Sequence, residues 1–351
     1  MDKRFQSRLT LAAVALALTA LVASQLGQRV TATTNAVSAV RPAASAQLGA
    51  LPASDIIIFV DTERLVNDTL PNFLAGDAEL FARAKAKLDR FQKETGVDPR
   101  SFDSLAIGMR LGATSSGDPR FVAIGHGDFV ASQLIDTGFA AAQKKENIGR
   151  VEEQYEGKTI YILTPAAGRA DNCSRNGKTE SCRMAVAALD SNTIALGDLE
   201  SVRATLSPGA ARVDQSLVDL ATRNSQAFAG FAGNLPQGAA RHFGIRNGRA
   251  DKLAASVRQM YGSVSTVGTT AESTLALRTE TAEQAREIAD GLNGLKFISK
   301  LGFGGHSGGS KEKVEAFSNL IKALSINVQN DEVEIKLNVT QADIAPLMRR
   351  Y

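Results

Sequence analysis

The chain has 351 residues, a length that suggests two domains, and its 44% hydrophobic and 22% charged residues are typical of a folded globular protein. Its 40 basic residues nearly balance its 37 acidic residues, so the chain lacks the basic footprint that nucleic-acid-binding proteins carry. Aromatic residues make up only 5% and tryptophan is absent, which argues against a site that stacks sugars or bases.

The N-terminus has the pattern of a secretory signal. Three basic side chains precede an apolar run over residues 9–23, and this order is typical of a signal peptide. The run is short for a membrane span, which needs about 20 residues. We therefore expect a signal peptide over residues 1–24 with cleavage before Gln25, and export to the periplasm or beyond the cell. The alternative is an uncleaved anchor that tethers the chain through residues 9–26.

The segment after the signal has no clear hydrophobic period. Residues 25–53 are rich in Ala, Thr, Ser and Val. Such a composition predicts a flexible linker between the signal and the folded part.

A first α+β unit is expected over residues 54–207. The apolar run 55–60 is short enough for a buried strand. A helix is predicted over residues 77–95, because Asp77 suits the N-cap position and Gly96 the position after the C-cap. The remaining predicted elements are strands over 104–111 and 120–125, a helix over 132–145, hairpins over 151–163 and 184–196, and a short helix after Asp198.

The two cysteines of the chain, Cys173 and Cys182, lie close together in one polar segment. In an exported protein, two nearby cysteines most simply form a disulfide. The alternatives are a reactive thiol pair or a metal site, but the C-x-x-C spacing and a neighbouring histidine are both missing. We expect a structural disulfide that stabilises the fold by about 2–3 kcal/mol, and neither a metal site nor a cofactor.

The second half of the sequence repeats the same order of predicted elements over residues 214–351. Residues 333–339 alternate strictly between apolar and polar side chains, which is typical of a strand with one buried face. The resulting fold prediction is α+β, with two similar units that arose by internal duplication. Each unit is expected to be a mainly antiparallel sheet with helices packed on one face. The elements predicted here are strands over 227–233, 256–266, 273–278, 324–328 and 333–339, and helices from Thr281 and from Thr340.

Several segments resemble a group of exported bacterial proteins of unknown function that have a duplicated α+β architecture. The similar segments are residues 52–55, 94–99, 155–161 and 188–197. The resemblance implies architecture and an exported location. It implies no activity, cofactor or catalytic residue.

Three motifs that could indicate chemistry have simpler interpretations. The glycine-rich segment 302–311 departs from the phosphate-loop pattern, and we interpret it as a connector between helices. The turn around His126 and Asp128 lacks a neighbouring nucleophile motif. The acidic residues near Asp61 lack the spacing of a calcium loop, and we interpret them as acids at the start of a helix.

These observations predict a non-catalytic protein of the cell envelope that binds a protein, peptide or lipid-like partner, and no nucleic acid, through a groove between its two units. The alternative is an exported hydrolase whose active site assembles only in the folded chain, with His126 or His242 as the base.

Overall fold

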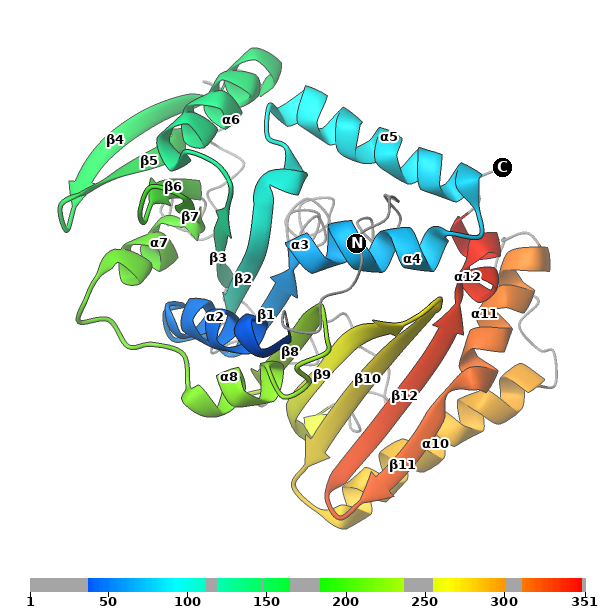
Figure 1. Cartoon of the computed structure of the whole chain (residues 1–351). Helices are drawn as coiled ribbons and strands as arrows, with labels where there is room; N and C mark the ends of the chain where they lie inside the picture. Colours follow the sequence, from blue (N-terminus) through cyan, green and yellow to red (C-terminus); the bar gives the residue numbers. More distant parts are fainter. Residues whose placement is uncertain are drawn as a thin grey trace. The chain divides into compact units, whose positions relative to one another are not determined.

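The computed structural model describes residues 37–111, 119–146, 148–164, 184–236, 255–300 and 311–348 (Figure 1). The chain divides into two compact units that interleave along the sequence. We call Thr33–Arg64 with Lys85–Thr222 the N-terminal unit, and Leu65–Ala84 with Arg223–Tyr351 the C-terminal unit. The sequence predicts two consecutive units over residues 54–207 and 214–351. In the structure, Leu65–Ala84 lies within the first of these ranges but belongs to the C-terminal unit. Helices and antiparallel strands make up both units, so the predicted α+β class is confirmed.

The N-terminal unit contains seven antiparallel strands in the order β1-β2-β3-β7-β6-β5-β4. Small and branched apolar side chains form a buried row across one face, because they lie directly opposite one another on successive strands. This row includes Ala106, Ile124, Ala195 and Ala187. The strands are β1 (Ile56–Asp61), β2 (Phe102–Arg110), β3 (Arg120–Gly127), β4 (Gly149–Tyr155), β5 (Lys158–Thr164), β6 (Met184–Ala188) and β7 (Thr193–Asp198).

Helix α2 corrects the prediction of a flexible linker over residues 25–53. Residues Val37–Gly49 form this helix, which contacts β1 and β2. Leu48 and Leu51 are fully buried, and the Gln47 amide donates a hydrogen bond of 3.0 Å to the Ile124 carbonyl oxygen. The linker prediction is therefore wrong from Val37 onward. Burial against the sheet stabilises this helix, whereas its Ala- and Ser-rich sequence has no clear helical pattern.

Helices cover the sheet of the N-terminal unit from both sides, where the sequence suggests one covered face. Arg150 of β4 forms an ion pair of 2.7 Å with Asp136 of α6 (Ala131–Glu146). Glu153, also in β4, pairs with Arg203 of α7 (Leu199–Leu206) at 2.6 Å. Residues 150 and 153 point to opposite faces of a strand, so α6 and α7 lie on opposite sides. The other helical elements are α3 (Thr62–Arg64), the 3₁₀ helix η2 (Pro99–Ser101), α8 (Gln215–Ala221) and α5 (Ala78–Thr95), whose residues up to Ala84 belong to the C-terminal unit.

The C-terminal unit contains five antiparallel strands in the order β11-β12-β10-β9-β8. These are β8 (Ala229–Asn234), β9 (Val257–Val267), β10 (Thr270–Thr279), β11 (Ser325–Gln329) and β12 (Glu332–Thr340). Its helical elements are the π-helical turn η1 (Leu65–Thr69), α4 (Leu70–Leu74), α10 (Ala282–Lys300), α11 (Lys311–Ala323) and α12 (Gln341–Met348).

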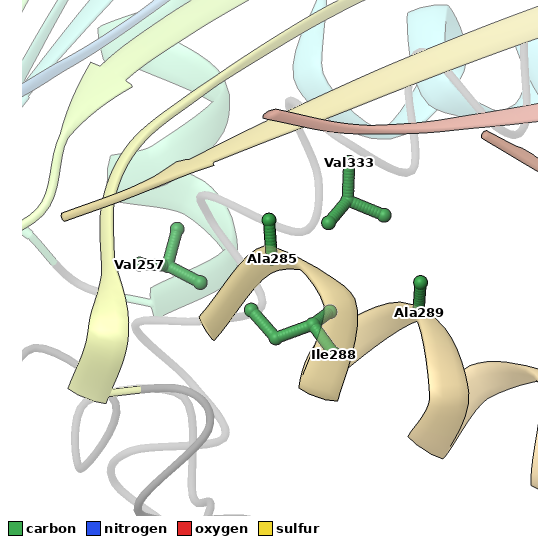
Figure 2. Close-up of a cluster of buried hydrophobic side chains, with 5 residues drawn as sticks. All are labelled: Val257, Ala285, Ile288, Ala289 and Val333. Carbon is green, nitrogen blue, oxygen red and sulfur yellow. The ribbon is translucent and has the colours of Figure 1, made fainter. Parts of the chain in front are cut away.

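One face of this sheet packs on α10, which contacts β10, β11 and β12. Figure 2 shows Ala285, Ile288 and Ala289 of α10 beside Val257 and Val333 of the sheet. The helix therefore buries an apolar stripe, and Val333 is buried as expected from the alternation over residues 333–339.

The two units share one connectivity. In the N-terminal unit, β1, β2 and β3 are followed by helix α6, by the hairpin of β4 and β5, and then by β6 and β7. Strand β7 pairs with β3. In the C-terminal unit, β8, β9 and β10 are followed by helices α10 and α11 and then by β11 and β12. Strand β12 pairs with β10. The hairpin of β4 and β5 is an addition of the N-terminal unit. A short helix follows the last strand in each, α7 in one and α12 in the other.

Candidate functional site

Several residues singled out in the sequence lie outside the described residues. These are Cys173 and Cys182 of the predicted disulfide, His242, and the glycine-rich segment over residues 302–310. The predicted signal peptide over residues 1–24 also lies outside them. Among the helices that the structure describes, none has the length and apolarity needed to cross a membrane.

His126 lies near the end of β3, with a side chain that is 41% exposed. Its Nδ1 atom is 3.1 Å from Oγ1 of Thr193, and its Nε2 atom is 3.9 Å from Oδ2 of Asp103. The imidazole thus has a hydroxyl group on one side and a carboxylate on the other.

His126 belongs to a row of polar residues that lie directly opposite one another on four neighbouring strands. Asp61 of β1 faces Ser104 of β2, Ser104 faces His126, and His126 faces Thr193 of β7. Directly opposed residues share one face of a sheet, so these four side chains lie on the same side. We call this set, Asp61, Ser104, His126 and Thr193, the polar row.

The acidic residues near Asp61 serve the start of a short helix. Oδ1 of Asp61 accepts a hydrogen bond of 2.8 Å from the Arg64 backbone N–H. Within the described part of the chain, no group of three or more His, Cys, Asp or Glu residues is arranged to hold a metal ion.

A second polar cluster, absent from the sequence-based predictions, lies on the sheet of the C-terminal unit. Arg223 donates a hydrogen bond of 2.9 Å to the Tyr261 hydroxyl, which donates to Glu332 at 2.9 Å. Arg278 donates to the same carboxylate at 2.8 Å and to the Gln259 side-chain oxygen at 2.8 Å. We call these five residues, Arg223, Gln259, Tyr261, Arg278 and Glu332, the tyrosine cluster.

Both arginines of the cluster stack on the aromatic ring. The guanidinium carbon of Arg223 lies 5.7 Å from the Tyr261 ring centroid, and that of Arg278 lies 5.2 Å from it. These distances are those of cation–π pairs. Ala276 and Ala232 lie directly opposite Tyr261 on the neighbouring strands, and such small side chains leave space beside the ring.

The strand register places the cluster on the face opposite to α10. Arg278 lies directly opposite Gln259 on β9 and Glu332 on β12. The next residue of β12, Val333, packs against α10. Successive residues of a strand point to opposite faces, so Glu332 and its partners point away from this helix.

The cluster carries one more positive than negative charge, since two guanidinium groups share one carboxylate. Burial raises the pKa of the Tyr261 phenol above its usual value, and the hydrogen bond to Glu332 raises it further. Burial is the largest single effect on the pKa of Arg278 and lowers it, but the hydrogen bond to Glu332 and the interactions with Tyr261 and the Glu332 charge together outweigh burial, so the net shift is upward. Tyr261 is therefore neutral and Arg278 is charged at neutral pH.

Polar residues extend the cluster along the same face. Glu334 and Lys336 of β12 share the face of Glu332 and form an ion pair of 2.9 Å. Asn234 of β8 accepts a hydrogen bond of 2.9 Å from Gln259. On β11, the residues opposite Lys336, Glu334 and Glu332 are the polar Ser325, Asn327 and Gln329.

Comparisons with known proteins supply no family for the chain. No family model and no curated protein matches it. Among solved structures, crystal forms IV, III and I of TP0453 are similar, with TM-scores of 0.44, 0.43 and 0.41 and identities of 11%, 11% and 10%. They cover 86%, 85% and 86% of this chain, and 96% of TP0453 in each case. No function is inferred from a likeness of this degree.

Proposed function

We propose that this chain is a non-catalytic exported protein of the cell envelope that binds a protein or peptide partner through an acidic side chain, and that the tyrosine cluster is the binding site. The observation that carries the proposal is the state of Arg223. Its guanidinium is held against the Tyr261 ring, and only one of its nitrogens, Nη1, has a hydrogen-bond partner among the described residues.

The chemistry of the partner follows from the guanidinium N–H donors of the cluster that are not used within it. Arg278 uses its Nε and Nη1 atoms on Glu332 and Gln259, so it is largely occupied within the cluster. Arg223 is an exposed residue with its Nε and Nη2 donors available within the described part of the chain. A guanidinium edge of this kind fits the two oxygens of a carboxylate. Stacking on Tyr261 lowers the side-chain entropy that would be lost on binding.

Binding of an acidic peptide tests this site. The probe is a fluorescently labelled hexaglutamate peptide, measured by anisotropy with the purified mature protein. We expect Arg223→Gln to weaken binding by about tenfold, the effect of losing one charge-assisted pair. The matched control is Arg258→Gln, which removes an arginine from the same strand as Tyr261 whose Nε atom is paired with Glu280 at 2.6 Å. Equal affinity of both variants, or no binding by the unmodified protein, would overturn the proposal.

The exported location rests on the signal pattern over residues 1–24 and on the close spacing of Cys173 and Cys182. Mass spectrometry of the protein from fractionated cells tests both together. We expect an N-terminus at Gln25 and a mass that corresponds to an intact disulfide. Recovery of the full-length chain from the cytosol with both thiols reduced would contradict export.

The common connectivity of the two units supports an origin by duplication of one strand–strand–strand–helix–strand–strand–helix unit. Within this proposal, the tyrosine cluster is a specialisation of one copy. The corresponding strands of the other copy carry the polar row instead.

The polar row motivates a second candidate function, that of an exported hydrolase. In this candidate, His126 acts as the base, with the Thr193 hydroxyl within hydrogen-bond distance and Asp103 facing the other ring nitrogen. Hydrolysis of p-nitrophenyl acetate by the mature protein, lost in His126→Ala and retained in Arg223→Gln, would favour the hydrolase. Equal background rates in all three proteins would exclude this candidate for ester substrates.

A further inference from the structure

Strand β11 ends the order of described strands in the C-terminal unit. It pairs with β12 over Ser325–Gln329. Because alternate residues of a strand direct their backbone N–H and C=O groups to opposite edges, about half of these groups point away from β12. Such an edge is a template for another strand.

The sequence of β11 lacks the charged residues and prolines that usually prevent an edge strand from pairing with another chain. None of its five residues is charged and none is proline. Strand β4, at one end of the strand order in the N-terminal unit, differs because it carries Arg150, Glu152 and Glu153. Charged side chains on an edge strand oppose pairing with another chain. Of the two, β11 is therefore the edge suited to accept a partner.

The side chains of β11 also form a self-complementary pattern. Ile326 and Val328 lie opposite Ile335 and Val333, on the face covered by α10, whereas Ser325, Asn327 and Gln329 lie on the other face. In an antiparallel pair of two copies centred on Asn327, Ile326 of each copy lies opposite Val328 of the other. Ser325 then lies opposite Gln329, and the two Asn327 residues oppose each other. Apolar groups meet apolar groups, polar groups meet polar groups, and no like charges are opposed.

We propose that the mature protein forms a symmetric dimer in which β11 pairs antiparallel with β11 of a second copy, so that the sheet of the C-terminal unit continues across a two-fold axis. The proposal is independent of the binding function assigned to the tyrosine cluster. A two-fold contact requires a patch that is complementary to itself, and the uncharged Ser-Ile-Asn-Val-Gln strand meets this requirement.

Exposed apolar side chains beside β11 fit this dimer. Val328 is 38% exposed although it lies on the face that packs on α10, and Phe297 of α10 is 62% exposed. The ammonium group of the neighbouring Lys296 binds the carbonyl oxygen of Leu324, just before β11, so this part of α10 lies at the start of the strand. In the antiparallel pair, the start of one β11 faces the end of the other, which brings Phe297 toward Val328 of the second copy. The dimer would thereby cover two exposed apolar side chains per chain.

The oligomeric state of the purified mature protein tests the proposal, measured by light scattering after size-exclusion chromatography over a wide range of concentration. We expect the mass of two chains for the unmodified protein. Val328→Lys is expected to give the mass of one chain, because it places a charge within the apolar pair. Val151→Lys is the matched control on the β4 edge, where the same residue type is 53% exposed, and it is expected to remain dimeric.

Charge exchange at Asn327 separates self-pairing from other causes of dimerisation. Asn327→Lys and Asn327→Glu each oppose two like charges across the axis, so each variant alone is expected to be monomeric. Their mixture is expected to restore the mass of two chains, because Lys then opposes Glu. A monomeric unmodified protein, a dimeric Asn327→Lys variant, or a mixture that stays monomeric would overturn the proposal.

Discussion

The hydroxyl of Tyr261 lies 2.9 Å from each of the two carboxylate oxygens of Glu332, on a strand that is not its direct neighbour. Strand β10 separates the two residues in the sheet, so this contact joins β9 to β12 across β10. Tyr261 is only 6% exposed. A buried hydroxyl that binds both a carboxylate and a guanidinium holds the tyrosine cluster in one arrangement.

Tyr261→Phe should lower the free energy of unfolding by about 1–2 kcal/mol, because the partly buried Glu332 and the exposed Arg223 each lose their hydrogen bond with the buried hydroxyl. Urea denaturation followed by circular dichroism measures this change. Tyr155→Phe is the control, since Tyr155 ends β4 outside the cluster, and it should change stability by less than about 0.5 kcal/mol. Equal changes in the two variants would contradict the role assigned to the Tyr261 hydroxyl.

The stability of the protein should depend on the protonation of Tyr261 at alkaline pH. The pKa of the phenol in the folded state is raised by burial and by Glu332, whereas the unfolded value is about 10. A raised pKa in the folded state stabilises the fold below the unfolded pKa, and this contribution is lost as the pH rises through the folded pKa.

We therefore expect unfolding to become easier as the pH rises above about 10. Tyr261→Phe should weaken this alkaline loss of stability, measured by urea denaturation at a series of pH values. An equal alkaline loss of stability in the variant and in the unmodified protein would contradict the role assigned to Tyr261.

Thr62 offers a site for stabilisation. Its side chain is buried, at 5% exposure, and its Oγ1 atom has no hydrogen-bond partner among the described residues. Thr62→Val replaces an unsatisfied hydroxyl with a methyl group of similar size and should raise the free energy of unfolding by about 1 kcal/mol. Thr205→Val should have the opposite effect, because the Thr205 hydroxyl donates to the Ser201 carbonyl oxygen at 2.8 Å. Thermal melts of both variants would reveal the difference in sign.

Gly127 is required by the close approach of two backbones. A Cβ atom at this position would lie 2.0 Å from the Ser101 carbonyl oxygen and 2.7 Å from the Phe102 Cα atom. Gly127→Ala should therefore lower the free energy of unfolding by at least about 2 kcal/mol, because backbone must move to relieve the clash. Gly294→Ala in α10 meets no atom within 4 Å and should stabilise the helix by up to about 1 kcal/mol. Chemical denaturation that ranks the two alanine variants in the reverse order would contradict this account.

Elements with local signals were predictable from the sequence. The helix expected over residues 77–95 is α5, and Asp77 accepts hydrogen bonds from the backbone N–H groups of Glu79 and Leu80 as an N-cap should. The alternation over residues 333–339 correctly predicted β12, and its hairpin partner is β11. Helix α2 was missed because its stability comes from the burial of Leu48 and neighbouring residues against the sheet, and not from an amphipathic period.

The tyrosine cluster was not predictable, because its members are far apart in the chain. Tyr261 lies 38 positions from Arg223 and 71 from Glu332. Each is a single polar residue within a strand or a loop, and such residues occur on the exposed face of any antiparallel sheet. Only the pairing of β9, β10 and β12 brings them together. His126 was singled out from its turn, but its neighbour Thr193 became known only from the pairing of β3 with β7.

Helix α2 sets a limit on how far the mature chain can be trimmed by proteases. Cleavage at the predicted signal site would leave the whole helix in place. A protease that removed residues up to Ser54 would take away Leu48 and Leu51, both fully buried, together with the Gln47 amide that binds the Ile124 carbonyl oxygen. Residues from Val37 to Leu51 should therefore resist digestion, and a product that lacks them would report an unfolded N-terminal unit.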